Sequence, residues 1–306
     1  MPMPRDRVLL LLSTILCVGV WSTIALIVAT DSYAGAPGQT PVQAEPEPEV
    51  IKTIPGDPRK RVTEHPLPFS THAIARLRSS TRGCTATLVS PRIAVTAYHC
   101  LARRSKDQRE GLPEGAHSDR RHDDLVLKFG YDRGKFVVER GVKRFGAVSP
   151  TSDYAILILD RAVNTTDPNS DEPYIRPLVP MIDFGGLSYR DFKHENVILL
   201  GYSSDGQIGQ RGERLTYHAG CIAGSNRNEH IVGSNCVGYP GASGGPLVSY
   251  ELNDETGKLE PALIGIASGQ LRTELRTISI STADNFADDL DDLLIHEEEQ
   301  TGPFKP

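Results

Sequence analysis

Gly241-Ala242-Ser243-Gly244-Gly245-Pro246 is the most informative segment of this 306-residue chain. The glycines around Ser243 allow the backbone to turn tightly and to approach a substrate closely. They also leave backbone N–H groups free to point at an oxyanion as it develops. The pattern Gly-x-Ser-x-Gly is shared with the nucleophile turn of α/β-hydrolases, so this segment alone predicts a nucleophilic serine but not a fold.

A second segment, Thr96-Ala97-Tyr98-His99-Cys100, offers the base that such a serine needs. A serine hydroxyl is a poor nucleophile near neutral pH, and it needs an adjacent base that is itself oriented by a third group. His99 is the candidate base. Asp153 is the candidate acid, because it stands directly before the apolar run Tyr154–Leu159, which is typical of a core strand.

The order of these residues along the chain, His99, Asp153 and Ser243, argues against an α/β-hydrolase, in which the serine comes first and the histidine last. The only histidine after Ser243 is His296, which lies in a charged C-terminal tail. A set of Ser243, Asp284 and His296 would have the hydrolase order, but its setting does not suit a buried active site.

At these segments the chain resembles the chymotrypsin-like (trypsin-fold) serine peptidases, whose typical motifs are similar to TAAHC, DIALL and GDSGGP. The resemblance covers about residues 50–295 and is closer to the secreted bacterial branch that includes the glutamyl endopeptidases. It places the acid later than Asp123 and Asp124, the nearest rivals of Asp153. The segment that resembles the mature N-terminus of that branch contains Val50, Ile51, Asp57, Arg59, Val62 and Thr63.

The resemblance implies an all-β fold, with two six-stranded antiparallel β-barrels and a C-terminal helix. His99 and Asp153 would belong to the first barrel and Ser243 to the second. Short β-prone runs between turn residues independently favour an all-β barrel or sandwich. These runs are Cys84–Ser90, Ile93–Ala97, Leu125–Phe129, Phe136–Glu139, Tyr154–Leu159, Val197–Leu200, Leu215–Ile222, Pro246–Ser249, Leu263–Ala267 and Thr277–Ser281.

A helix is expected near the end of the chain, in agreement with the resemblance. The stretch Ser281-Thr282-Ala283-Asp284 resembles a capping box, which marks the start of a helix. Apolar residues then recur with helical spacing at Phe286, Leu290, Leu293 and Leu294.

The function implied by the resemblance is that of an exported serine endopeptidase that acts through an acyl-enzyme. His99 would be the base, Asp153 would orient it, and the N–H groups of Gly241 and Ser243 would form the oxyanion hole. Proteins or peptides would be the substrates, and we expect no cofactor and no metal ion. The rival hypothesis is a non-catalytic binding module with a peptidase fold, but such proteins usually lack one of the three residues.

Two comparisons with the family concern specificity. Val237 falls at the base of the expected S1 pocket, and the absence of a carboxylate there argues against a preference for Lys or Arg. Ala267 stands where the glutamyl endopeptidases carry a histidine, which weakens a preference for Glu. We therefore expect Val237, Ala267 and Ser268 to line a pocket for a small or apolar P1 residue.

Ala242 is a departure from the animal members of the family, which carry an aspartate directly before the nucleophilic serine. In their zymogens this aspartate pairs with the freed N-terminus, and an alanine cannot do so. Two routes to an active site are therefore compatible with the sequence. A propeptide could be removed near Glu49–Val50, which would act through steric release or through docking of the new N-terminus. Alternatively, folding alone could form the active site.

Four cysteines, Cys84, Cys100, Cys221 and Cys236, follow the N-terminal region and favour two disulfides in an exported chain. The sequence allows three pairings, and the resemblance selects Cys84–Cys100, which leaves Cys221–Cys236 as the second pair. No pair has the C-x-x-C spacing of a zinc site.

The N-terminal region indicates export. Residues 8–29 are almost continuously apolar and follow Arg5 and Arg7, which predicts either a signal peptide cleaved after Ala34 or a retained membrane anchor. The predicted organisation is a leader (1–34), a Pro-rich linker or propeptide (35–49) and a peptidase domain (50–306). We expect the protein to be secreted, either outside the cell or into the periplasm; the alternative is a protein anchored in the membrane by residues 8–29. A net charge of −6 without basic runs gives no indication of nucleic-acid binding.

Overall fold

The computed structural model describes residues 53–79, 83–101, 124–181, 194–226, 231–253, 257–270 and 276–301. The chain divides into Met1–Glu47 and Pro48–Pro306, and all described residues belong to the second part. The expected leader (1–34), its apolar run and the whole linker (35–49) lie outside the described residues. Among those that are described, no helix is long and apolar enough to cross a membrane.

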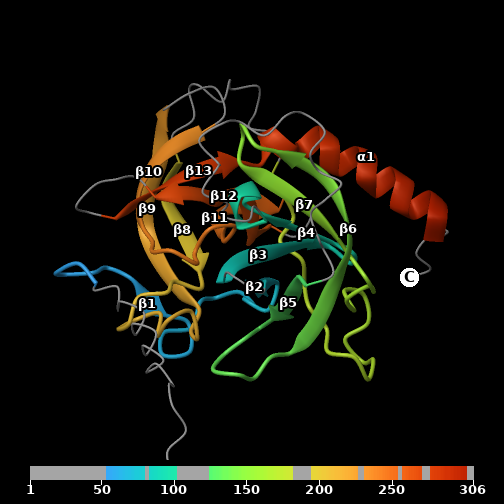
Figure 1. Cartoon of the computed structure of the whole chain (residues 1–306), viewed down its shortest axis with the longest axis horizontal. Coiled ribbons are helices and arrows are strands. Elements are labelled where there is room, and N and C mark those ends of the chain that lie inside the picture. The colour runs from blue at the N-terminus through green and yellow to red at the C-terminus, as the bar shows by residue number, and fades with distance from the viewer. Residues whose placement is uncertain are drawn as a thin grey trace, which may run out of the picture. The chain divides into compact units, whose positions relative to one another are not determined.

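Six strands from the first half of the chain form a closed antiparallel barrel in the order β2-β3-β4-β7-β6-β5. The barrel closes because β5 pairs with β2, which sets Ala75 opposite Phe129. These strands run from blue-green to green in Figure 1. Their bounds are β2 Ile74–Arg78, β3 Gly83–Ser90, β4 Ile93–Thr96, β5 Val126–Phe129, β6 Val138–Ser149 and β7 Tyr154–Leu159.

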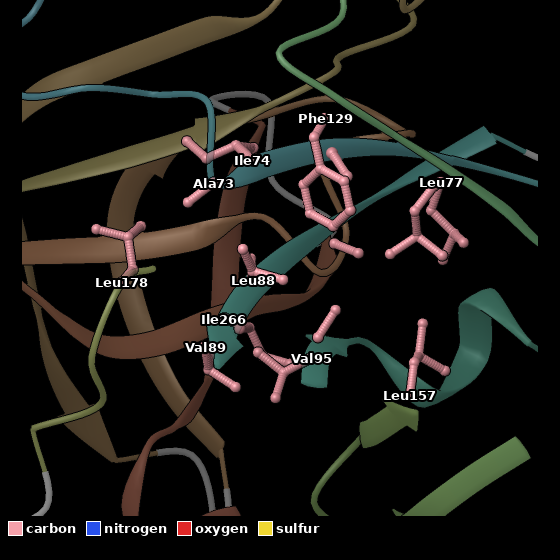
Figure 2. Packing of buried hydrophobic residues seen from close by; sticks show 14 of the residues in the cluster. Ala73, Ile74, Leu77, Leu88, Val89, Val95, Phe129, Leu157, Leu178 and Ile266 are labelled. Carbon is pink, nitrogen blue, oxygen red and sulfur yellow. The ribbon is translucent and has the colours of Figure 1, made fainter. Parts of the chain in front are cut away.

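The core of this barrel follows from short strands that consist almost entirely of apolar residues. Every residue of β4 and β7 is buried, as a continuous apolar run predicts. Figure 2 shows Leu77, Leu88, Val95 and Phe129 converging from four neighbouring strands. Ile266, from the other half of the chain, belongs to the same cluster, so one apolar core continues from the first barrel into the second.

Six strands from the second half form the other barrel, in the order β9-β10-β13-β12-β11-β8, and this barrel closes because β8 also pairs with β9. A short strand, β1 (Lys60–Arg61), adds to β9 and ties the N-terminal segment to this barrel. The two six-stranded barrels implied by the resemblance are confirmed. The bounds are β8 His194–Gly201, β9 Thr216–Asn226, β10 Ile231–Val237, β11 Pro246–Asn253, β12 Lys258–Gln270 and β13 Thr277–Thr282.

Three strands, β1, β2 and β10, have no counterpart among the predicted runs. Two arginines interrupt the apolar pattern of β2, yet Arg76 is buried there because its guanidinium pairs with Glu213 of the other barrel at 2.6 Å. In β10 the register shifts after Gly233, so the alternation of side chains is broken. The run predicted at Phe136–Glu139 also starts too early, because β6 begins at Val138.

The C-terminal helix α1 (Asp284–Thr301) is present, and its expected apolar face packs on the core through buried Phe286 and Leu290. Figure 1 shows the helix beside β6 and β7. The predicted capping box is wrong. Ser281 is still part of β13, and its buried hydroxyl has no partner among the described residues. Instead, the Thr282 hydroxyl donates to Asp284 Oδ1 at 2.5 Å.

Both disulfides implied by the resemblance are present. Cys84–Cys100 joins β3 to the short 3-10 helix η1 (Tyr98–Cys100), and Cys221–Cys236 joins β9 to β10. The first bond attaches the residue after His99 directly to the barrel wall, so it restricts the position of that histidine.

Candidate active site

The pairing of β4 with β7 explains how His99 and Asp153 come together. The two strands are antiparallel, with Thr96 at the end of β4 opposite Ala155 near the start of β7. The segment that leaves β4 and the segment that enters β7 therefore lie at the same end of the barrel. His99 is in η1, just after β4, and Asp153 directly precedes β7.

The carboxylate of Asp153 binds His99 at two places. His99 Nδ1 lies 2.8 Å from Asp153 Oδ2 and 3.1 Å from Oδ1, and the His99 backbone N–H donates to Oδ1 at 3.0 Å. The backbone of Asp153 also accepts from Tyr98 N at 3.2 Å. An imidazole that donates from Nδ1 to a carboxylate carries its lone pair on Nε2, as a general base requires.

Ser268 is a third member of this group, and it comes from β12 of the second barrel. Its hydroxyl donates to Asp153 Oδ2 at 2.6 Å. Asp153 itself has a backbone φ of 53°, a left-handed conformation that is uncommon outside glycine, asparagine and aspartate. Hydrogen bonds from both barrels thus hold this carboxylate in one orientation.

The segment that carries Ser243 lies between β10 and β11 and contacts the first barrel beside His99. The carbonyl of Ser243 accepts from Thr85 N at 2.8 Å. Thr85 follows Cys84, whose disulfide leads to Cys100, the neighbour of His99. The segment is also bound to its own barrel, because Gly244 N donates to Ala267 O at 2.7 Å.

Close packing explains two of the glycines around Ser243. Gly244 has a φ of 79°, and a side chain there would place Cβ 2.2 Å from Thr85 O and from Thr96 Oγ1. Gly241 has a φ of 96°, and its Cβ would lie 2.4 Å from Tyr202 O. Both positions need a residue without Cβ, for conformation and for space.

The peptide between Pro240 and Gly241 has a defined orientation. Pro240 O accepts from Ser204 N at 2.7 Å, and the N–H of Gly241 points the opposite way because the peptide is trans. On the other side, the carbonyl of Gly241 accepts from Thr85 Oγ1 at 2.8 Å. Within the described segments, the N–H groups of Gly241 and Ser243 donate to no protein acceptor.

The three residues predicted for the substrate pocket have different surroundings. Val237 is buried, and its N–H donates to His218 Nδ1 at 2.9 Å. Burial lowers the pKa of His218, which favours the neutral ring that can accept this bond. Ala267 is buried and binds the Ser243 segment through its backbone, while Ser268 contacts Asp153. The role of these residues in substrate binding stays a prediction.

The other candidates are placed differently. The carboxylate of Asp153 contacts His99, whereas of its two rivals Asp124 is exposed and Asp123 lies outside the described residues. Asp284 is exposed at the start of α1. Cys84, His99 and Cys100 offer potential metal-ligand atoms within 4.8 Å of one another, but the two cysteines form a disulfide and therefore provide no thiolate.

Two contacts at this site have no signal in the sequence. Ser268 was expected in the pocket, and its bond to Asp153 depends on how the two barrels meet. Thr85 lies in β3, where a threonine is an ordinary strand residue, yet its hydroxyl also accepts from Tyr202 N at 3.0 Å and so links β3 to the second barrel.

Comparison with known protein families gives one match. The family model described as "Trypsin-like peptidase domain" matches residues 84–254, more than half of the chain. The matched region includes His99, Asp153 and Ser243. A comparison with curated proteins finds no match.

Proposed function

Because this chain belongs to the family of trypsin-like peptidases, we propose that it is an exported serine endopeptidase with Ser243 as the nucleophile. The observation that carries this proposal is the double contact of Asp153 with His99, through the imidazole at 2.8 Å and the backbone N–H at 3.0 Å. This contact orients the base in the way that acyl transfer by a serine requires.

In the proposed reaction, His99 Nε2 takes the proton of the Ser243 hydroxyl as its oxygen attacks the carbonyl carbon of a peptide bond. Asp153 keeps the imidazole in the required tautomer and stabilises the imidazolium. The N–H groups of Gly241 and Ser243 bind the oxyanion of the tetrahedral intermediate. His99 then gives its proton to the leaving amine. Water, activated by the same histidine, releases the acyl group and regenerates the Ser243 hydroxyl.

The anchoring of the Ser243 segment supports the proposed oxyanion hole. Three hydrogen bonds, to the carbonyls of Pro240, Gly241 and Ser243, hold the segment around the nucleophile, and the bond to Pro240 fixes the peptide that carries the Gly241 N–H. Preorganised donors of this kind need no rearrangement during the reaction, and each contributes about 3–4 kcal/mol to the stabilisation of the transition state.

The two disulfides support export, because such bonds persist in oxidising compartments outside the cytoplasm. In this proposal the leader directs the chain across the membrane, and residues 50–306 form the peptidase. Its substrates are proteins or peptides. A small or apolar P1 residue remains the expected preference, since Val237 provides no charge at the base of the expected pocket.

The test is a comparison of the wild-type protein with the Ser243→Ala variant on a peptide library. Wild type should cleave peptides and should form a covalent adduct with an organophosphonate at Ser243, and the variant should do neither. Equal cleavage by the variant would contradict the mechanism. A folded wild-type protein that binds peptides without cleaving them would instead indicate the non-catalytic binding module.

A further inference from the structure

A buried charge cluster lies on the second barrel, outside the three residues of the proposed mechanism. The guanidinium of Arg59 bonds to Asp57 Oδ2 at 2.7 Å and to Asp205 Oδ1 at 2.8 Å. The exposed fractions of these side chains are 1% for Arg59, 5% for Asp57 and 0% for Asp205. Arg59 comes from the segment before β1, whereas Asp205 is in the loop between β8 and β9, so the cluster joins distant parts of the chain.

Burial of this kind makes the cluster sensitive to the loss of one member. A buried ion pair has little net effect on stability when it is complete, but removing one partner leaves an uncompensated charge. The carboxylate of Asp205 is otherwise well bound, because its Oδ2 accepts from Ile208 N at 2.7 Å and from Gly209 N at 3.0 Å. The cation on Arg59 is thus held rigidly in place.

The same guanidinium contacts the segment that leads to the nucleophile. Arg59 Cζ lies 4.0 Å from the centre of the Tyr239 ring, within the range of a cation–π interaction. The Tyr239 hydroxyl accepts from Ile54 N at 2.7 Å, so the N-terminal segment binds both the face and the tip of this ring. The carbonyl of Tyr239 in turn accepts from Ala242 N at 3.0 Å, which closes the turn just before Ser243.

The loop that carries Asp205 is bound to the same turn from the other direction. Ser204 N donates to Pro240 O at 2.7 Å, and this bond sets the direction of the Gly241 N–H. Arg59 therefore reaches the proposed oxyanion hole by two routes, through the ring of Tyr239 and through Asp205 with its neighbour Ser204.

We propose that Arg59 is a positioning residue that holds the turn Tyr239–Ala242 in the conformation in which the Gly241 N–H faces the oxyanion. The buried side-chain cation takes the place of the ion pair that Ala242 cannot form, and no free N-terminal amine is needed for this purpose. This inference rests on the proposed function. It favours folding alone over N-terminal docking as the source of an ordered oxyanion hole.

The variants that test it are Arg59→Ala and Arg59→Lys, with Arg61→Ala as the matched control. Arg61 lies on the same segment and also binds the β8–β9 loop, through Ile208 O at 2.9 Å and Gln207 O at 2.6 Å. Among the described residues, the Arg61 side chain forms no hydrogen bond or ion pair with Tyr239 or Asp205. All three proteins are compared with wild type by thermal unfolding and by kcat and KM on a peptide amide.

We expect Arg59→Ala to lower kcat about 100-fold with little change in KM, the effect of losing one oxyanion donor. A peptide aldehyde forms a tetrahedral adduct with Ser243, and the affinity of the variant for it should fall by a similar factor. The corresponding peptide alcohol forms no adduct, and the affinity for it should not change. Methylguanidinium added to this variant should restore part of the kcat. Arg61→Ala should keep the wild-type kcat.

Two outcomes would overturn the proposal. One is a folded Arg59→Ala protein with the wild-type kcat, and the other is a loss of kcat in Arg61→Ala as large as that in Arg59→Ala. If Arg59→Ala does not fold, Arg59→Lys decides, because lysine keeps the charge but cannot bond both carboxylates in the same fork geometry. A normal kcat in that folded variant would refute the inference. A wild-type protein without peptidase activity would refute the proposed function instead, so the two failures are distinguishable.

Discussion

Replacing Thr85 with valine removes one buried hydroxyl and almost no volume. Thr85 is fully buried, and its Oγ1 accepts from Tyr202 N at 3.0 Å and donates to Gly241 O at 2.8 Å. Valine has the same shape but leaves both of these backbone groups without a partner. The backbone bond from Thr85 N to the Ser243 carbonyl does not depend on the side chain.

Leaving a buried donor or acceptor unsatisfied costs about 1–3 kcal/mol, so two such groups lower the free energy of unfolding by about 3 kcal/mol after partial relaxation. For a domain of this size, that corresponds to a decrease in Tm of about 6–12 °C. Because Gly241 also loses the bond that anchors its carbonyl, we expect kcat to fall about tenfold, less than the loss of an oxyanion donor outright.

The matched control is Thr85→Ser, which keeps the hydroxyl and removes one methyl group, at a cost of about 1 kcal/mol. Unfolding in urea, with both disulfides intact, gives the stabilities, and a peptide amide assay gives kcat. If Thr85→Val and Thr85→Ser are equally stable and equally active, the hydroxyl does not hold the Gly241 segment, and the reasoning is wrong.

Two further predictions concern the groups that join the barrels. Ser268→Ala should lower kcat about tenfold, because Asp153 loses one hydrogen bond that orients its carboxylate; an unchanged kcat on a peptide amide would argue against a role of Ser268 in orienting Asp153. Burial raises the pKa of Glu213, but bonds from Tyr131 and Arg76 outweigh it and lower the pKa. The Glu213→Gln variant should therefore be less stable than wild type at pH values above the ordinary Glu pKa of about 4.3. This difference in the free energy of unfolding should disappear as the pH falls through the lower pKa of Glu213 in the folded protein. Urea unfolding of both proteins at several pH values will check this.

Much of the fold could be predicted because most barrel strands contain a short apolar or β-branched run between turn residues. The run Tyr154–Leu159 coincides with β7 because it is buried over its whole length. The strands β1, β2 and β10 were missed, because β1 and β2 contain arginine or lysine and the register of β10 shifts within the strand. Arg76 in β2 is buried with its guanidinium paired to Glu213, from the loop between β8 and β9, and packed on the ring of Tyr131.

The C-terminal helix was also predicted only in part. Its apolar face was predicted because helical periodicity is a local property of the sequence. Its starting point was not, because the strand β13 extends through Ser281 and Thr282 to complete the second barrel. Pairing with β12 decided the boundary against the local capping signal.

The sequence by itself determined the residue types that acyl transfer needs, their order along the chain and the cysteines for two disulfides. These depend on chemistry that a segment of a few residues already carries. Sequence and resemblance together already named Asp153 as the partner of His99, whereas tertiary structure alone decided which hydroxyl binds that carboxylate and which cation contacts the turn before Ser243. Arg59 and Asp205 are 146 residues apart in sequence, and the pairing of β1 with β9, beside the loop that follows β8, brings them within hydrogen-bonding distance.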